Sequence, residues 1–159
     1  MRSVAFLLTL FIFASCDSSL GFRAYHEFSN GWSSDENISF TSDQIVQTPS
    51  DIYIHIRNTN TYPYSNLFLV AELRDSIQVL ARDTLEYAMA DPQGKWLGAG
   101  FLDVKESKLW WKADWNPPHS GPYFIEFSQR VRNNGSVEGV SFLEGIINVG
   151  VSIEPQIQP

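Results

Sequence analysis

The sequence predicts an all-β protein, an antiparallel β-sandwich of jelly-roll or immunoglobulin-like type, preceded by a helical signal peptide that is removed. Aromatic residues make up 14% of the 159-residue chain and, with the isoleucines and valines, favour strands. Gly, Pro, Asn and Asp recur at short intervals, and no window after residue 20 repeats its apolar residues with a helical period. About eight short strands separated by turns are typical of a sandwich.

Residues 1–15 have the pattern of a bacterial lipoprotein signal peptide. A short positive segment with Arg2 precedes an apolar run over residues 4–13, which is too short for a membrane-spanning helix of roughly 20 residues. A Phe-Ala-Ser sequence then leads to Cys16, the only cysteine of the chain. We therefore predict cleavage before Cys16 and acylation of its thiol. The alternative is an ordinary secretory signal that leaves a free thiol.

Removal of residues 1–15 from the 159-residue chain leaves 144 residues, which suit one domain. We expect a lipidated tether over residues 16–23, a β-sandwich domain over residues 24–153 and a flexible tail over residues 154–159. A domain of this size can bury about 70% of its unfolded surface. Since one cysteine cannot form an intrachain disulfide, the apolar core alone must stabilise the fold.

Short apolar or alternating segments predict the individual strands. Residues 51–58 alternate most clearly, because three isoleucines occupy one face while Tyr53, His55 and Arg57 occupy the other. The remaining predicted strands are residues 24–28, 38–41, 67–73, 79–87, 109–115, 122–131 and 145–153.

Two turns and one strand face follow from local chemistry. Residues 91–94 carry Asp, Pro and Gly at the positions that a type I turn favours. Asn134 and Gly135 indicate a hairpin, because both residues tolerate a positive φ. In the last strand, the alternation places Ile147 on one face together with Val149, Val151 and Ile153.

The charge of the chain excludes two kinds of partner. The net charge is −7, and loss of Arg2 with the signal peptide makes it about −8. Nucleic acid binding needs a basic surface, and an anionic lipid surface repels an acidic protein. Acyl chains on Cys16 are therefore the predicted attachment to a lipid bilayer, and two or more chains give stable anchoring.

The sequence contains no pattern typical of a catalytic or cofactor site. His26, His55 and His119 lack metal-ligand spacing, and no thiol nucleophile remains once Cys16 is acylated. The glycine-rich residues 94–100 lack the Gly-Lys-Ser/Thr ending of a phosphate loop. We predict no enzymatic activity, no metal and no cofactor. A hydrolase with paired carboxylates is the remaining enzymatic alternative.

Trp110 and Trp111 are neighbours, so in a strand their side chains point to opposite faces. Trp111 shares its face with Leu109 and is expected in the core. Trp110 shares its face with Lys112 and Asp114 and is expected to be exposed. Exposed aromatic side chains on a β-sandwich can stack on sugar rings or anchor a protein interface.

Several motifs are spread over residues 24–153. The most specific are Tyr62-Pro63-Tyr64-Ser65-Asn66-Leu67 and Asp91-Pro92-Gln93-Gly94-Lys95-Trp96-Leu97-Gly98-Ala99-Gly100. The weaker ones are Tyr25-His26-Glu27-Phe28, Asp83-Thr84-Leu85-Glu86, Gly121-Pro122-Tyr123, Gln129-Arg130-Val131-Arg132 and Leu143-Glu144-Gly145-Ile146. Together these motifs resemble the gliding-motility lipoprotein GldH family.

The resemblance implies a non-enzymatic lipoprotein of the gliding-motility and type IX secretion-associated machinery. Such a protein is expected in the cell envelope, lipid-anchored and facing the periplasm, where it binds other machinery proteins. We expect the interaction surface on two loops and one strand, with candidate residues Tyr62, Tyr64, Asn66, Asp91, Gly94, Lys95, Trp96 and Trp110. The alternative is a carbohydrate-binding envelope lipoprotein that uses Trp110 to hold a glycan.

Overall fold

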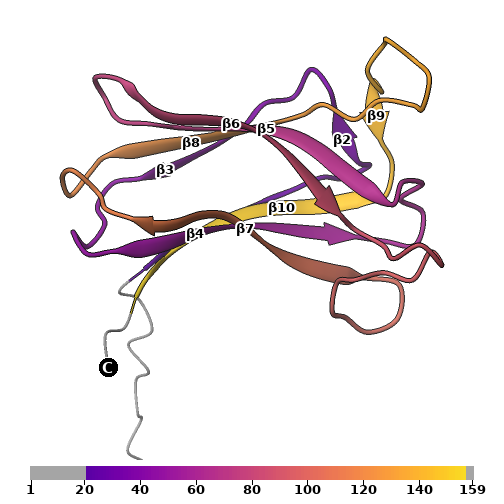
Figure 1. Ribbon diagram of the computed structural model, residues 1–159, viewed down its shortest axis with the longest axis horizontal. Coiled ribbons are helices and arrows are strands. Elements are labelled where there is room, and N and C mark those ends of the chain that lie inside the picture. The colour runs from indigo at the N-terminus through magenta and orange to yellow at the C-terminus, as the bar shows by residue number, and fades with distance from the viewer. Residues whose placement is uncertain (1–20, 157–159) are drawn as a thin grey trace, which may run out of the picture.

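The computed structural model describes residues 21–156, so the predicted signal peptide and Cys16 lie outside the described residues (Figure 1). The described strands are β1 (Phe22–Glu27), β2 (Trp32–Ser33), β3 (Ile38–Ser42), β4 (Ser50–Asn58), β5 (Asn66–Arg74), β6 (Val79–Ala88), β7 (Lys105–Trp115), β8 (Tyr123–Gln129), β9 (Phe142–Leu143) and β10 (Ile146–Pro155). Residues 21–156 contain no helix that is long and apolar enough to span a membrane.

The strands form two four-stranded sheets and a small ribbon. The first sheet has the order β1-β10-β4-β7, the second has the order β3-β8-β5-β6, and β2 pairs with β9. Every one of these strand pairs is antiparallel. The two sheets lie one above the other in Figure 1. The predicted all-β antiparallel sandwich is therefore confirmed.

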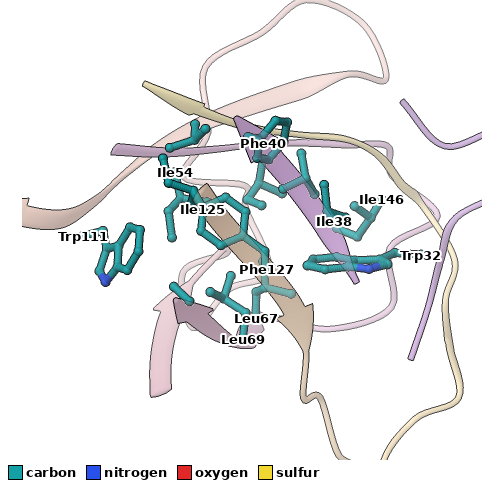
Figure 2. Packing of buried hydrophobic residues seen from close by; sticks show 14 of the residues in the cluster. Trp32, Ile38, Phe40, Ile54, Leu67, Leu69, Trp111, Ile125, Phe127 and Ile146 are labelled. Carbon is teal, nitrogen blue, oxygen red and sulfur yellow. The ribbon is translucent and has the colours of Figure 1, made fainter. Parts of the chain in front are cut away.

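The core lies between the two sheets and is built by alternation within the strands. In β4, Ile52, Ile54 and Ile56 are completely buried, as their spacing predicts. Figure 2 shows Phe127 of β8 between Trp111 and Trp32. The Phe127 ring lies 5.8 Å from Trp111 in an edge-to-face arrangement that aromatic pairs favour. Trp111 thus belongs to the core, as predicted.

One strand position differs from the prediction because β10 contains a bulge. The register between β10 and β4 shifts between Ile146 and Asn148, and Ile146 is completely buried while Ile147 is only partly buried. A bulge inserts one extra residue, so strict alternation assigns the wrong residue beyond it. The predicted placement of Ile147 on one face with Val149, Val151 and Ile153 is therefore wrong, because these three residues follow the bulge and are buried while Ile147 is only partly buried.

The turn at Asn134 and Gly135 is present but does not join two paired strands. Ser136 N donates to Asn133 O at 2.9 Å, and Gly135 has φ = 80°. Strand β8 ends at Gln129 and pairs with β3 and β5, so the turn closes only a small loop through the Arg132–Gly139 bridge. The predicted hairpin is therefore confined to this loop.

The antiparallel order gives the sandwich two distinct ends. Phe22 of β1 is paired with Ile153 of β10, and Pro155 with Ser50 of β4, so both ends of the described chain lie together. We call this the tether end. Residues 59–65, 89–104 and 144–145 connect the opposite ends of the strands, and we call them the loop end. The ten residues of β10 separate the two ends by roughly 33 Å.

Truncation of a core ring tests the assignment of the core. We expect Phe127→Ala to lower the free energy of unfolding by about 3–5 kcal/mol, because it removes a fully buried aromatic side chain and leaves a cavity. The matched control is Phe101→Ala, whose ring is 84% exposed and whose loss should change stability by at most about 0.5 kcal/mol. Urea unfolding measures both, and equal effects would contradict the assignment.

Candidate functional site

The β4–β5 and β6–β7 loops, which carry the two most specific motifs, lie side by side at the loop end. Met89 N and Ala90 N both donate to Ser65 O, at 2.7 and 3.0 Å. Trp96 Nε1 donates to Asn60 Oδ1 at 2.9 Å. Segments about thirty residues apart in the sequence are thus joined by backbone and side-chain hydrogen bonds.

Tyr62 is buried beneath the contact between the β4–β5 and β6–β7 loops. Its side chain is only 3% exposed, and its hydroxyl donates to Asn66 O at 2.7 Å. Its ring lies 5.6 Å from Tyr64 and 6.2 Å from Trp96. Burial raises the pKa of Tyr62 far above its ordinary value, so the hydroxyl remains a donor. Tyr62 therefore holds the loops together from below and is not available on the surface, contrary to its predicted place in a contact surface.

Gly145 brings a third segment against Tyr62. It has φ = 79°, and a Cβ atom there would lie 2.3 Å from Tyr62 N. Only glycine allows this backbone conformation and this approach together. The β9–β10 connection is thereby fixed to the β4–β5 loop.

The predicted turn at residues 91–94 is confirmed by the hydrogen bond from Gly94 N to Asp91 O at 2.9 Å. Asp91 Oδ1 also accepts from Gln93 N and Lys95 N, at 2.9 and 2.8 Å. Gly94 has φ = 81°, which explains the glycine. Asp91 and Gly94 therefore shape the turn, and Lys95 is exposed at its end, as are Pro92 and Gln93.

Tyr64 and Asn66 connect the loop end to its surroundings. The Tyr64 hydroxyl donates to Asn133 Oδ1 at 3.1 Å, and Asn66 Nδ2 donates to Glu86 Oε1 at 3.1 Å. The structure thus brings together all the predicted candidates of the two loops. It divides them into supporting residues, such as Tyr62, and displayed residues, such as Lys95.

The sequence prediction missed the apolar tip of the β6–β7 loop. Phe101 and Leu102 are 84% and 76% exposed, and Leu97 and Val104 of the same loop are exposed as well. Beside this tip lies an open hollow of about 420 Å³, partly lined by Asn60, Asp103 and Glu144. The signal that could have found the tip is an adjacent Phe-Leu pair directly after a Gly-Ala-Gly sequence, where a solvent-facing loop is expected.

Trp110 lies apart from the loop end. It sits midway along β7 on the outer face of the first sheet and is 54% exposed, in agreement with its predicted exposure. Its ring lies 5.3 Å from Tyr53, and Lys108 Nζ lies 3.9 Å from the centre of the Tyr53 ring. This aromatic pair is a second displayed feature, separate from the two loops.

His55 lies on the same outer face, yet its side chain is only 3% exposed. The ring of Tyr25 lies 5.5 Å away and covers it. His55 Nε2 is 2.8 Å from Ser152 Oγ, and the Ser152 hydroxyl donates to Glu154 Oε1 at 2.8 Å. This assigns the proton of neutral His55 to Nε2, while Nδ1 has no hydrogen-bond partner in the described chain and lies 3.7 Å from Glu106 Oε1.

The Ser152, His55 and Glu106 side chains resemble the order of a hydrolytic triad, but the geometry does not support nucleophilic attack. Ser152 is completely buried, and its proton is directed to Glu154 rather than to His55. A nucleophilic serine must give its proton to the histidine and reach a substrate. Within residues 21–156, no group of three or more His, Cys, Asp and Glu is arranged to hold a metal ion.

The buried histidine makes stability depend on pH. Burial and the nearby positive charge of Arg23 lower the pKa of His55 below 6.5, Lys108 adds to this effect, and Glu106 and Glu154 oppose it. The unfolded chain therefore binds the proton more tightly than the folded chain. The contribution of neutral His55 to the free energy of unfolding is complete above its pKa in the unfolded chain, about 6.5. It is lost as the pH falls from there toward the lowered pKa of His55 in the folded chain.

We expect urea unfolding between pH 7.5 and 5.5 to show a loss of stability with a slope of at most about 1.4 kcal/mol per pH unit from this group. His55→Gln should remove that component of the slope. The control His26→Gln should retain it, because His55 is intact. A slope that is the same in the His55→Gln variant and in the unchanged chain would contradict the assignment.

Comparison with known proteins identifies the family of this chain. A family model described as GldH lipoprotein matches residues 21–153. A "Gliding motility lipoprotein GldH homolog" of Christiangramia forsetii is 45% identical over 152 residues, covering 94% of this chain and 92% of the relative. The "Gliding motility lipoprotein GldH" of Flavobacterium johnsoniae is 37% identical over 149 residues, covering 93% of this chain and 92% of the relative.

Among solved structures, dimeric latent PorU from Porphyromonas gingivalis aligns with 86% of this chain and 13% of its own. The identity is 8% and the TM-score 0.33, which is too low to support any further statement. The match of the family model over most of the described residues and the two relatives agree with the resemblance carried by the motifs. The chain belongs to the GldH lipoprotein family, and membership of a lipoprotein family implies a membrane-anchored place in the cell envelope.

Proposed function

We propose that this lipoprotein is acylated at Cys16 and holds its β-sandwich in the periplasm. There it acts without catalysis, through contacts between its loop end and other proteins of the gliding-motility and type IX secretion-associated machinery. The names of the two relatives support a role in motility.

The observation that carries the proposal is the opposite placement of the tether end and the loop end. Gly21 precedes β1 at the tether end, and four residues separate it from Cys16. The five steps along the chain from Cys16 to Gly21 span at most about 18 Å, so an acylated Cys16 keeps the tether end close to its membrane. The loops with the two specific motifs then face away from that membrane, toward proteins of the surrounding compartment.

The geometry of the described residues supports a binding role better than a catalytic one. The Ser152 hydroxyl is buried and directed to a carboxylate, and the hollow at the loop end is open rather than enclosed. Enzyme sites are usually concave pockets with converging polar groups. The loop end instead presents displayed side chains on well-supported turns, which suits recognition of another protein.

A deletion strain of the source bacterium tests the proposal. We expect the deletion to abolish colony spreading or to reduce the set of secreted proteins, and the unchanged chain to restore both. Cys16→Ala should move the protein out of the membrane fraction and fail to restore either, because acylation provides the anchor. Ser19→Ala in the same tether is the control and should behave as the unchanged chain. Normal spreading and secretion in the deletion strain would refute the proposal.

A second candidate function, glycan binding, is favoured by the exposure of Trp110 beside Tyr53. Adjacent aromatic rings can stack on the apolar face of a sugar. If this surface binds glycans, the protein should bind members of a glycan array, and Trp110→Ala should lower that binding roughly tenfold or more. Phe101→Ala, an exposed ring at the loop end, is the control and should bind normally. An array without signal would exclude this function.

A further inference from the structure

The exposed apolar side chains of the described surface are unevenly distributed. Val137 is 88% exposed and stands alone in its loop, while Ile77, at 90%, has a single exposed apolar neighbour, Val79. The β6–β7 loop, in contrast, exposes Leu97, Phe101, Leu102 and Val104 within eight residues. Single exposed apolar residues are ordinary, whereas a group of them marks an interaction site. We call residues 97–104 the apolar tip.

The apolar tip is held in one conformation by its own backbone contacts. Ala99 and Glu106 exchange two backbone hydrogen bonds, at 2.9 and 2.7 Å. Lys105 Nζ donates to the carbonyl oxygens of Leu102 and Gly100, at 2.8 and 3.4 Å. Leu102 itself has φ = 56°, a left-handed conformation that leucine rarely adopts. These contacts restrain the tip before it meets a partner, and such restraint lowers the entropy cost of binding.

Close backbone approach explains the glycines of the tip. A Cβ atom on Gly98 would lie 2.8 Å from Ser107 Oγ, and one on Gly100 would overlap the Val104 carbonyl oxygen. Both positions exclude larger residues, so the loop can fold back on itself and direct Phe101 and Leu102 outward. Asn60 Nδ2 donates to Asp103 Oδ1 at 3.0 Å and ties the tip to the β4–β5 loop.

The hollow beside the tip is acidic, which indicates the charge of a group that could bind there. Asp103 and Glu144 line it, and its lining contains no Lys or Arg. Glu144 is exposed and forms no ion pair within the described residues. A basic side chain fits beside these carboxylates, while an anionic lipid surface is repelled by them. The charge therefore favours a protein over a bilayer.

We propose that the apolar tip is the anchor of the protein–protein interface of this lipoprotein. Phe101 and Leu102 insert into an apolar pocket of a protein partner, and a Lys or Arg at the rim of that pocket enters the hollow lined by Asp103 and Glu144. This inference rests on the proposed function and deepens it, because it names the residues that make the contact and the chemistry of the partner surface. Interface anchors of this kind are large apolar side chains in a desolvated pocket.

The test uses the full-length chain, reintroduced into the deletion strain as matched serine variants. The double variant Phe101→Ser and Leu102→Ser should reach the membrane fraction at the normal level and yet fail to restore spreading or secretion. Ile77→Ser removes an equally exposed apolar side chain near the tether end and should restore both fully. Glu144→Lys should weaken restoration, because it places a positive charge where the partner presents its own.

Two further measurements identify the occupant. A photo-crosslinking residue at position 101 should give a protein adduct that is absent with the same residue at position 77, and Glu144→Lys should lower its yield roughly tenfold. The unacylated Cys16→Ala chain should not sediment with vesicles of phosphatidylethanolamine and phosphatidylglycerol. Sedimentation that disappears in the double variant would assign the tip to a bilayer and overturn the proposal.

The outcomes separate this inference from the function on which it rests. If the unchanged chain and the double variant restore spreading and secretion equally, the apolar tip is not the anchor, while the proposed function stands. If the deletion strain spreads and secretes normally, the proposed function fails, and the inference fails with it. Equal adducts at positions 101 and 77 would also overturn the inference.

Discussion

The pairing of the first strand with the last is the constraint on which both ends of the molecule depend. Strand β1 runs antiparallel to β10 over six paired positions, from Phe22 opposite Ile153 to Glu27 opposite Asn148. Both ends of the described chain are thereby held at one end of the sandwich. Since β4 begins beside the end of β10, the β4–β5 and β6–β7 loops must lie at the other end. The direction of these two loops thus follows from strand order rather than from the loops themselves.

The first sheet is unusual because its outer face is also partly buried. Gly150 leaves room for the Tyr25 ring, since a Cβ atom there would lie 2.4 Å from that ring. Tyr25 in turn covers His55, and Arg57 lies 5.3 Å from the centre of the Tyr25 ring. Because Gly150 has no side chain, Tyr25 can cover His55, and a histidine that would otherwise be exposed to solvent is buried. This cover adds to the burial of Ser152 and to the direction of its hydroxyl toward Glu154, so the triad-like order of Ser152, His55 and Glu106 lacks the geometry for nucleophilic attack.

What the sequence could predict depends on how local each feature is. The alternation of β4 and the turn at residues 91–94 are set by neighbouring residues, and both were predicted correctly. The burial of His55 depends on Tyr25, thirty positions earlier, and the register of β10 depends on a bulge at Ile146 to Asn148. Tyr62 is predicted on a contact surface together with its loop, yet its ring is buried against Tyr64 and against Trp96 from another loop. An alternating pattern within one strand cannot predict such contacts, because they depend on residues far away in the sequence.

The apolar tip contains local choices that stability alone does not explain. A leucine in the left-handed region costs about 1 kcal/mol or more relative to glycine, and four exposed apolar side chains gain nothing from the core. The amino group of Lys105 nevertheless donates to the carbonyl oxygens of Gly100 and Leu102 and stabilises this conformation. Natural sequences agree with their fold at most positions, and departures concentrate where function requires them. The strain at Leu102 and the exposure of Phe101 therefore point to the same place, the part of the loop end that faces away from the tether.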